Sequence, residues 1–194
     1  SKSASGSKIE DIDGNKYVDI GLGYGVSFFG NNPGFVTEAV KEQLDQGYEL
    51  AFQQDNLSEI ASKFCALAGV ERMCFSNTGT EAVMAALRLA RAKTGRSKIV
   101  IFTGGYHGTF DGVLGLPSIN GNGASPISRG TTVGMLDDLV VLNFGTTEAI
   151  DYIEENHSEI AGVMLEPVQS RKPGIHLKEF IKELRQLTET RDIA

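Results

Sequence analysis

The spacing of hydrophobic and polar residues changes along the chain, and each change predicts an element of secondary structure. Between residues 9 and 20, two short alternating runs flank the turn residues Asp13, Gly14 and Asn15, which indicates a β-hairpin. From residue 71 onward, short apolar runs alternate with segments whose apolar residues recur every three or four positions. This alternation favours a mostly parallel sheet with helices on both faces, a doubly wound α/β/α sandwich.

Apolar spacing and end signals place the expected elements. Pro33 at a first helical position and Gly47 after the last turn delimit the first helix, and Asn56 and Gly69 delimit the second. The buried stripe of the second helix is expected to comprise Leu57, Ile60, Ala61, Phe64 and Leu67. Further helices are expected at 80–91, 147–156 and 178–191, and strands at 73–76, 98–103, 139–142, 161–165 and from 192 onward. The segment 112–134 has no evident element, which is typical of a functional or mobile loop.

The chain divides into three stretches by composition. Residues 1–7 are small and polar, and a segment so poor in apolar residues is expected to be a linker or a disordered lead. Residues 8–48 hold the hairpin, a glycine-rich loop and the first helix. Residues 49–194 are expected to be the N-terminal part of a large α/β domain that is incomplete at its C-terminus, because the sequence stops where another strand begins.

Composition and charge narrow the classes of function. With 41% hydrophobic residues and 23 glycines, the 194-residue chain has an ordinary soluble composition. No apolar run approaches the ~20 residues of a membrane helix and no leader opens the chain, so we expect a cytoplasmic protein without a membrane partner. The net charge of -7 argues against nucleic acid as a partner. Cys65 and Cys74 are expected to be buried free thiols rather than a disulfide or a metal pair, and no metal site is expected.

The residues that open the helix near position 80 form a candidate anion site. Thr78 and Glu81 have the T-x-x-E spacing of a capping box, and Gly79 between them allows a ligand to approach the backbone closely. A helix start presents free amide hydrogens and a positive dipole end, and the hydroxyls of Thr78 and Thr80 add donors for a phosphate. Most T-x-x-E pairs only cap a helix, so the spacing alone leaves a purely structural role open.

Two further groups of candidate residues follow predicted strands. Tyr106 and His107 come soon after the buried strand at 98–103, and Glu166 comes at the end of the strand at 161–165. Ligands of open α/β sheets bind at the carboxyl ends of the strands, so these side chains are expected near a ligand. The residues leave two alternatives open, a histidine bonded within its own turn and a glutamate that is only a satisfied structural carboxylate.

Four motifs together resemble a known enzyme family. They are IEDIDGNKYVDI from Ile9, SNTGTEAVMAALRLARAKTGR from Ser76, YHG from Tyr106 and EPVQ from Glu166. In this order and spacing they resemble class III pyridoxal-phosphate-dependent aminotransferases of fold type I, in particular the glutamate-1-semialdehyde aminomutase-like branch. The stretches PISRGTTVGMLDDLVVLNFG and LEPVQSRKPG add a likeness to the aminotransferase domains of hybrid polyketide and nonribosomal peptide synthetases. Those domains install an amino group on a carrier-tethered β-keto acyl chain.

The resemblance implies a fold, a cofactor and a set of site residues. The fold would be the large domain of a fold type I transferase, an α/β/α sandwich, and the cofactor would be pyridoxal 5'-phosphate. The residues that match the family's cofactor site are Thr78, Gly79, Thr80, Tyr106, His107 and Glu166. In the family the first three positions hold the cofactor phosphate, the tyrosine stacks on the pyridine ring with the histidine next to it, and the glutamate lies near the cofactor's edge.

The family's two principal catalytic groups are expected outside these residues. The Schiff-base lysine and the aspartate at the pyridine nitrogen both lie downstream of the last helix in the family. The lysines here that match no family lysine motif are Lys93, Lys98, Lys172, Lys178 and Lys182. They are expected to be solvated surface charges. We therefore expect no catalytic residue in this chain, and we expect the 194 residues alone to be inactive.

Several functions fit these residues. The resemblance implies an aminotransferase that acts on a small-molecule amino donor and a keto substrate, the latter on an acyl carrier domain, and that works as a homodimer. One alternative is an aminomutase, which moves the amino group within one molecule. A non-catalytic nucleotide-binding or phosphate-binding α/β module is another, although neither G-x-G-x-x-G nor a Walker lysine is present. A third alternative is an interaction domain that has the same fold but does not catalyse a reaction.

Overall fold

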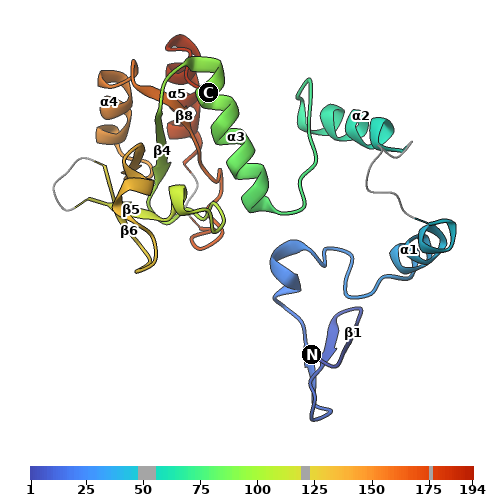
Figure 1. Ribbon diagram of the computed structural model, residues 1–194. Helices are drawn as coiled ribbons and strands as arrows, with labels where there is room; N and C mark the ends of the chain where they lie inside the picture. The colour runs from blue at the N-terminus through green and yellow to red at the C-terminus, as the bar shows by residue number, and fades with distance from the viewer. Residues whose placement is uncertain (48–55, 119–122, 175–176) are drawn as a thin grey trace. The chain divides into compact units, whose positions relative to one another are not determined.

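A computed structural model describes residues 1–47, 56–118, 123–174 and 177–194. They form two compact units, Ser1–Met73 and Cys74–Ala194, which we describe separately (Figure 1). The boundary expected between residues 48 and 49 lies outside the described residues, and the chain divides after Met73. The hairpin and the first two helices therefore belong to the N-terminal unit.

The N-terminal unit opens with a three-stranded antiparallel sheet. Strands β2 (Lys8–Glu10) and β3 (Lys16–Val18) form the predicted hairpin. The disordered lead expected at residues 1–7 is instead strand β1 (Ser3–Ser5), which pairs with β2. Backbone hydrogen bonds need no apolar side chains, so pairing with a strand edge orders a segment whose composition predicts disorder.

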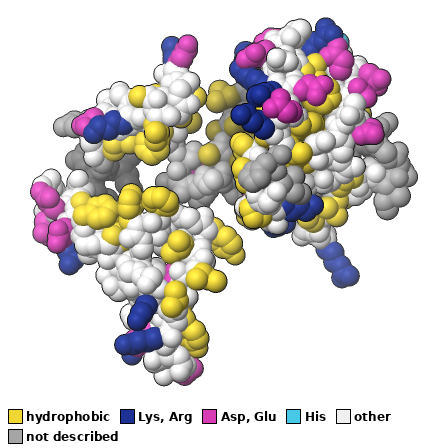
Figure 2. Space-filling model, turned by 180° about the vertical axis from the view of Figure 1, so that it is seen from behind, with side chains coloured by type: hydrophobic (Ala, Val, Ile, Leu, Met, Phe, Trp, Pro, Cys, Tyr) yellow, Lys and Arg dark blue, Asp and Glu magenta, His cyan; other side chains and the backbone are white. Residues whose placement is uncertain are grey.

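Two helices follow in the same unit. Helix α1 (Gly34–Gln46) begins one residue later than expected, with Pro33 at its N-cap, and α2 (Leu57–Ala68) ends as predicted at a left-handed Gly69. The buried stripe predicted for α2 is wrong, since no residue of the helix is buried and Phe64 is 53% exposed. Apolar spacing predicts which face of a helix should avoid water, but it does not supply the partner that covers that face. Figure 2 shows hydrophobic side chains on the surface of this unit.

The second unit is built on a parallel sheet in the order β7–β4–β8. Its main elements, in chain order, are α3 (Gly79–Thr94), β4 (Lys98–Phe102), β7 (Leu139–Leu142), α4 (Thr147–Glu155), β8 (Ile160–Val163) and α5 (Lys178–Thr190). All lie close to the ranges predicted from the sequence. The predicted parallel sheet and the alternation of strands with helices are both confirmed.

Alternate residues of β4 face two different cores. Ile99 and Ile101 pack in one core with α3, through Leu87. Val100 and Phe102 pack in the other, with residues of α4 and α5. Successive strand residues point to opposite faces, so α3 covers one face of the sheet and α4 and α5 cover the other (Figure 1). The α/β/α layering is therefore confirmed.

Two predictions for this unit are wrong. Residues 73–76 form no strand, and Phe75 is half exposed, because an apolar run becomes a strand only where another strand pairs with it. The segment 112–134, expected to lack structure, holds short elements: η2 (Asp111–Val113), the antiparallel pair β5 (Gly115–Pro117) and β6 (Ala124–Pro126), and η3 (Val133–Leu136). Elements of three or four residues are too short to show a period in the sequence.

Arg96 joins the end of α5 to the sheet. Its guanidinium donates hydrogen bonds of 3.2 Å to three backbone oxygens, one where β8 begins and two just after α5. Beyond α5, the Ala194 amide donates to the Ala161 oxygen over 3.1 Å, and the Val163 amide donates to the Ala194 oxygen over 2.9 Å. Ala194 thus lies beside β8, where the sequence predicts another strand.

The two cysteines are free, as expected, but neither is buried as predicted. Cys65 is only partly buried on α2, and Cys74 is exposed because the strand predicted around it does not form. None of the helices in the described ranges is long and apolar enough to cross a membrane. Within the same ranges, no group of three or more His, Cys, Asp or Glu side chains is placed to hold a metal ion.

Candidate functional site

The first turn of α3 has the geometry of an anion site. Thr78 Oγ1 accepts a hydrogen bond of 3.2 Å from the Glu81 amide, and the Glu81 carboxylate accepts one of 2.9 Å from the Thr78 amide. The predicted capping box is therefore confirmed. The amides of Gly79 and Thr80 have no acceptor among the described residues. Free amides at the positive end of a helix dipole attract an anion.

The loop that follows β4 is attached to this turn. The Thr109 amide donates a hydrogen bond of 3.1 Å to Thr80 Oγ1. Gly108 allows the close approach, because a Cβ built on it would lie 2.5 Å from the same oxygen. Its φ of +89° is also one that favours glycine. The segment that carries Tyr106 and His107 is thus held against the start of α3.

Glu166, which follows β8, holds the same loop through its carboxylate. One carboxylate oxygen accepts a hydrogen bond of 2.9 Å from the Tyr106 amide, and the other accepts one of 3.2 Å from the Ser170 amide. Burial raises the pKa of the Glu166 carboxyl, but the hydrogen bonds from these amides outweigh it and the pKa is lowered. The ionised carboxylate therefore has a structural role, and that role places Tyr106.

Gln169 is a buried residue of the site that the sequence did not single out. Its side chain is 3% exposed, and its Nε2 donates a hydrogen bond of 2.8 Å to the Thr103 oxygen at the end of β4. A Cβ on Gly104 would lie 2.9 Å from its Oε1, so the backbone approaches the amide closely. Gln169 therefore fixes the turn that leaves β4. The available signal was its place in the EPVQ motif, directly after a strand.

His107 is buried without a hydrogen-bond partner. Its side chain is 9% exposed, and Nε2 is the one buried side-chain nitrogen or oxygen that lacks a partner in the part of the chain that the structure describes. Burial lowers the pKa of His107, and the nearby Glu166 carboxylate opposes this shift only partly. The histidine is therefore neutral at neutral pH. The alternative of a histidine bonded within its own turn is wrong.

A cavity of about 270 Å³ lies beside this loop. Its described lining includes Tyr106, His107 and Arg171 and no lysine. Tyr106 is 51% exposed, and the central carbon of the Arg171 guanidinium lies 5.6 Å from the centroid of the tyrosine ring, within the range of a cation–π contact. An aromatic ring that is open beside a cavity can stack on a flat ligand.

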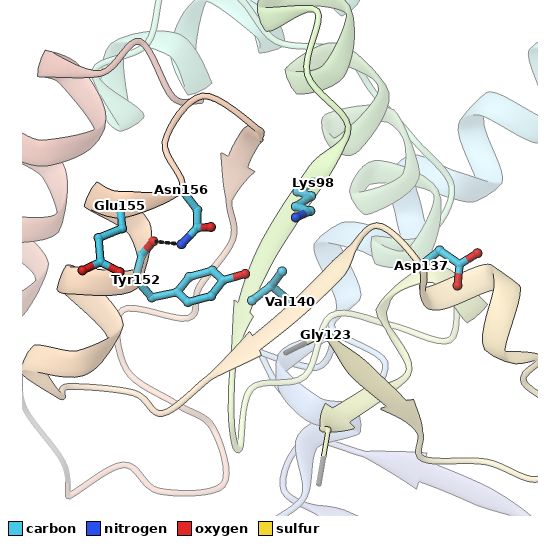
Figure 3. A pocket seen from close by; sticks show the side chains of 7 residues that line it. All are labelled: Lys98, Gly123, Asp137, Val140, Tyr152, Glu155 and Asn156. Carbon is cyan, nitrogen blue, oxygen red and sulfur yellow. Dashed lines mark hydrogen bonds between the residues drawn. The ribbon is translucent and has the colours of Figure 1, made fainter. Parts of the chain in front are cut away.

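A larger cavity, of about 500 Å³, includes Lys98 and Asp137 near the amino ends of β4 and β7 (Figure 3). Lys98 lines it, but its Nζ pairs with a Glu159 oxygen at 2.5 Å, and this hydrogen bond raises the pKa of Lys98. Figure 3 also shows Tyr152 of α4 and Asn156 at the C-cap of that helix, with Asn156 Nδ2 donating to the backbone oxygen of Tyr152 over 2.8 Å. None of the predicted site residues lines this cavity, so it is separate from the predicted site.

All six predicted site residues lie in the second unit, at the start of α3 or after the strands. Hydrogen bonds join Thr80 to the loop after β4, and the same loop to Glu166. The arrangement fits a flat ligand that carries a phosphate. Three observations support this fit: unpaired amides at the helix start, an exposed tyrosine ring, and a buried histidine nitrogen without a partner.

Comparisons with known proteins identify relatives in sequence and in structure. The sequence profile of the family described as "Aminotransferase class-III" matches residues 1–194. The chain is 35% identical over 198 residues to glutamate-1-semialdehyde 2,1-aminomutase of Methanosarcina acetivorans, covering 98% of this chain and 46% of that protein. A solved ω-transaminase from Sphaerobacter thermophilus is 31% identical with a TM-score of 0.89, covering 98% of this chain and 46% of that one. A solved glutamate-1-semialdehyde aminomutase from Pseudomonas aeruginosa PAO1 is 26% identical with a TM-score of 0.86, covering 100% of this chain and 43% of that one.

The chain thus spans less than half of the length of these relatives. The fold is that of fold type I pyridoxal-phosphate-dependent transferases, as predicted. Class III aminotransferases use pyridoxal phosphate as their cofactor. With a profile match over its whole length and these structural neighbours, the chain belongs to the class III aminotransferase family.

Proposed function

We propose that this chain forms the N-terminal part of the cofactor-binding region of a pyridoxal-phosphate-dependent aminotransferase. The observation that carries the proposal is the contact between the start of α3 and the loop that bears Tyr106. This contact brings the helix start proposed to bind the phosphate next to the tyrosine proposed to stack on the pyridine ring. Family membership supports the same cofactor.

In this proposal each site residue has a defined task. The free amides of Gly79 and Thr80 bind the cofactor phosphate, and the hydroxyl of Thr78 adds a donor because its oxygen, not its hydrogen, is used in the cap. The Tyr106 ring lies against the pyridine ring, and Glu166 fixes the backbone that carries it. When bound, the cofactor supplies an electron sink for the reacting carbon. The His107 Nε2 supplies a hydrogen-bonding group from the neutral imidazole next to the ring.

The proposed acceptor is a β-keto acyl chain on a carrier domain. The stretches PISRGTTVGMLDDLVVLNFG and LEPVQSRKPG support it by their likeness to aminotransferase domains of hybrid synthetases. The second candidate is an aminomutase, which is favoured by the names of relatives such as the Methanosarcina acetivorans protein. Both reactions need a Schiff-base lysine, which we expect in the remainder of the full-length protein, together with the aspartate for the pyridine nitrogen.

The two candidates are separated by one assay of the full-length protein loaded with pyridoxal phosphate. It is incubated in parallel with a carrier-bound β-keto thioester plus amino acid donors, and with glutamate-1-semialdehyde alone. We expect mass spectrometry to find an amine on the carrier, and a Tyr106→Ala variant to form much less of it. Isomerised glutamate-1-semialdehyde together with an unchanged carrier would assign the aminomutase reaction instead.

We also propose that the full-length protein is a homodimer. The N-terminal unit supports this with an exposed aromatic group, in which Phe28 lies 5.3 Å from Phe29 and Phe29 lies 5.5 Å from Phe35, between ring centroids. Exposed apolar groups of this kind mark surfaces that another protein surface covers. Light scattering of the purified full-length protein should give twice the mass of one chain, and the mass of a single chain would contradict the proposal.

A further inference from the structure

One side of the cavity beside Tyr106 is an exposed apolar face of the hairpin formed by β5 and β6. Leu116 of β5 and Ile127, which directly follows β6, both line this cavity of about 270 Å³. Leu116 is 47% exposed and Ile127 is 51% exposed. Other aliphatic side chains of the same lining, such as Ile101 and Val141 of the sheet, are buried. Leu116 and Ile127 are therefore accessible to a ligand in the cavity.

Strand pairing places these two side chains on one face of the hairpin. Leu116 pairs with Ser125, and Ile127 lies two positions after Ser125. The Ile127 amide donates a hydrogen bond of 3.0 Å to the Leu114 oxygen, so the pairing extends to this residue. Directly paired residues, and residues two positions apart in a strand, share a face. Leu116 and Ile127 thus form one apolar surface at the cavity, which we call the hairpin wall.

The hairpin is packed tightly against the parallel sheet. A Cβ built on Gly115 would lie 2.7 Å from Leu139 Cδ2 of β7 and 2.9 Å from the Cβ of Ala124. Leu139 is 2% exposed and belongs to the core between the sheet and α3. The hairpin wall is therefore held in place by a buried residue of the sheet, which lowers the entropy lost when the wall binds a ligand.

We propose that Leu116 and Ile127 bind the alkyl chain of the keto acceptor, an inference that rests on the proposed aminotransferase function. The Tyr106 ring is assigned to the cofactor, so the keto carbon reacts in this cavity and the rest of the chain extends along the hairpin wall. An alkyl chain that covers these exposed side chains removes apolar surface of both partners from water. Glutamate-1-semialdehyde is short and carries a carboxylate, so it would gain little from such a wall. Leu116 and Ile127 thus determine specificity for acceptors with a hydrocarbon chain.

Exposure alone does not distinguish the hairpin wall from other apolar residues of the same segment. Val133 and Met135 of η3 are 66% and 46% exposed, but neither is among the described residues that line the cavity. The proposal therefore depends on the position of Leu116 and Ile127 at the cavity. Val133 and Met135 are matched controls, because they are apolar, similarly exposed and close in sequence.

The test uses the full-length, cofactor-loaded protein and a series of β-keto thioesters on one carrier, with alkyl chains that lengthen by one methylene at a time. The double variant Leu116→Gln/Ile127→Thr keeps the approximate size of both side chains and makes them polar. Val133→Thr/Met135→Gln makes the same kind of change at the control positions. Mass spectrometry of the carrier gives kcat/KM for each chain length, and absorbance gives the cofactor content of each protein.

We expect kcat/KM of wild type to rise about two- to fourfold per added methylene while the chain contacts the hairpin wall, because complete transfer of a methylene out of water corresponds to about fourfold. Leu116→Gln/Ile127→Thr should lose most of this rise, and the control should keep it. Equal rises in the two double variants, or an active wild type without chain-length dependence, would overturn the inference.

If the hairpin-wall double variant does not fold, Ile127→Thr alone is compared with Val133→Thr. Ile127→Thr should then show the smaller rise in kcat/KM per methylene, and equal rises would overturn the inference. A wild type that binds cofactor but aminates no β-keto thioester would overturn the proposed acceptor, and the inference with it. Failure of wild type to bind cofactor would overturn the proposed function itself.

Discussion

Replacing Gly108 with alanine tests whether the loop after β4 must lie against α3 for the cofactor to bind. The new Cβ would lie 2.5 Å from Thr80 Oγ1 and 3.0 Å from Thr80 Cα, and both distances are too short for a carbon atom. The loop would have to withdraw from the helix start. Tyr106, two residues earlier in the loop, would move with it.

The expected cost has two parts. Alanine at a φ of +89° is strained by about 1–3 kcal/mol. Withdrawal of the loop also breaks the 3.1 Å hydrogen bond from the Thr109 amide to Thr80, which contributes about 0.5–1.5 kcal/mol. The sum is about 1.5–4.5 kcal/mol, and if it falls wholly on the cofactor-bound state, it weakens cofactor affinity roughly 10- to 2000-fold.

The assay is a titration of the full-length apoprotein with pyridoxal phosphate, followed by absorbance. Gly130→Ala is the matched control, because a Cβ there meets no atom within 4 Å and the backbone is not left-handed. In a Thr80→Ala background the nearest oxygen is gone, so the Gly108→Ala substitution should cost less. Equal dissociation constants for Gly108→Ala and Gly130→Ala would refute the reasoning.

Three further predictions use charged groups of the second unit. The pKa of Glu166 lies below its ordinary 4.5, so its carboxylate stabilises the fold above about pH 4.5, and this stabilisation is lost as the pH falls through the lowered pKa. Thermal unfolding at a series of pH values should show that loss in the wild type and not in a Glu166→Gln variant. The pKa of His107 lies below 6.5, so stability should fall as the pH drops from 6.5 towards that value, and His107→Gln should remove this dependence in denaturant unfolding. Lys98→Ala should cost about 0.2–1 kcal/mol of stability, since its partner Glu159 is largely exposed, and should leave cofactor affinity unchanged. A weaker affinity would make the cavity in Figure 3 part of the site.

Features that depend on neighbouring residues in the chain could be predicted from the sequence. The capping box needs only Thr78 and Glu81 three positions apart, and the structure contains it. The continuous apolar run of β4 likewise indicates burial on both faces, because no polar position interrupts it. The strand ends then locate Tyr106 and Glu166, since ligands of such sheets bind at that edge.

Features that depend on distant segments could not be predicted in this way. The contact of Arg171 with Tyr106 and the bond from Gln169 to the end of β4 each join residues more than 60 positions apart. Strand β1 (Ser3–Ser5) exists because β2 offers an edge, not because its own residues favour a strand. The buried stripe expected on α2 was wrong for the same reason, as its burial depends on a partner that spacing cannot reveal.

The guanidinium of Arg96 also positions the backbone that follows α5. One rigid, planar cation binds the backbone oxygens just after α5 and the oxygen where β8 starts, so it holds the segment after the helix beside the start of that strand. The position of the segment after α5 therefore depends in part on a side chain that lies 95 positions before Arg191, together with the backbone hydrogen bonds of Ile193 and Ala194. A lysine at position 96 would offer a point charge without this geometry, and would leave that segment held only by the backbone hydrogen bonds of Ile193 and Ala194.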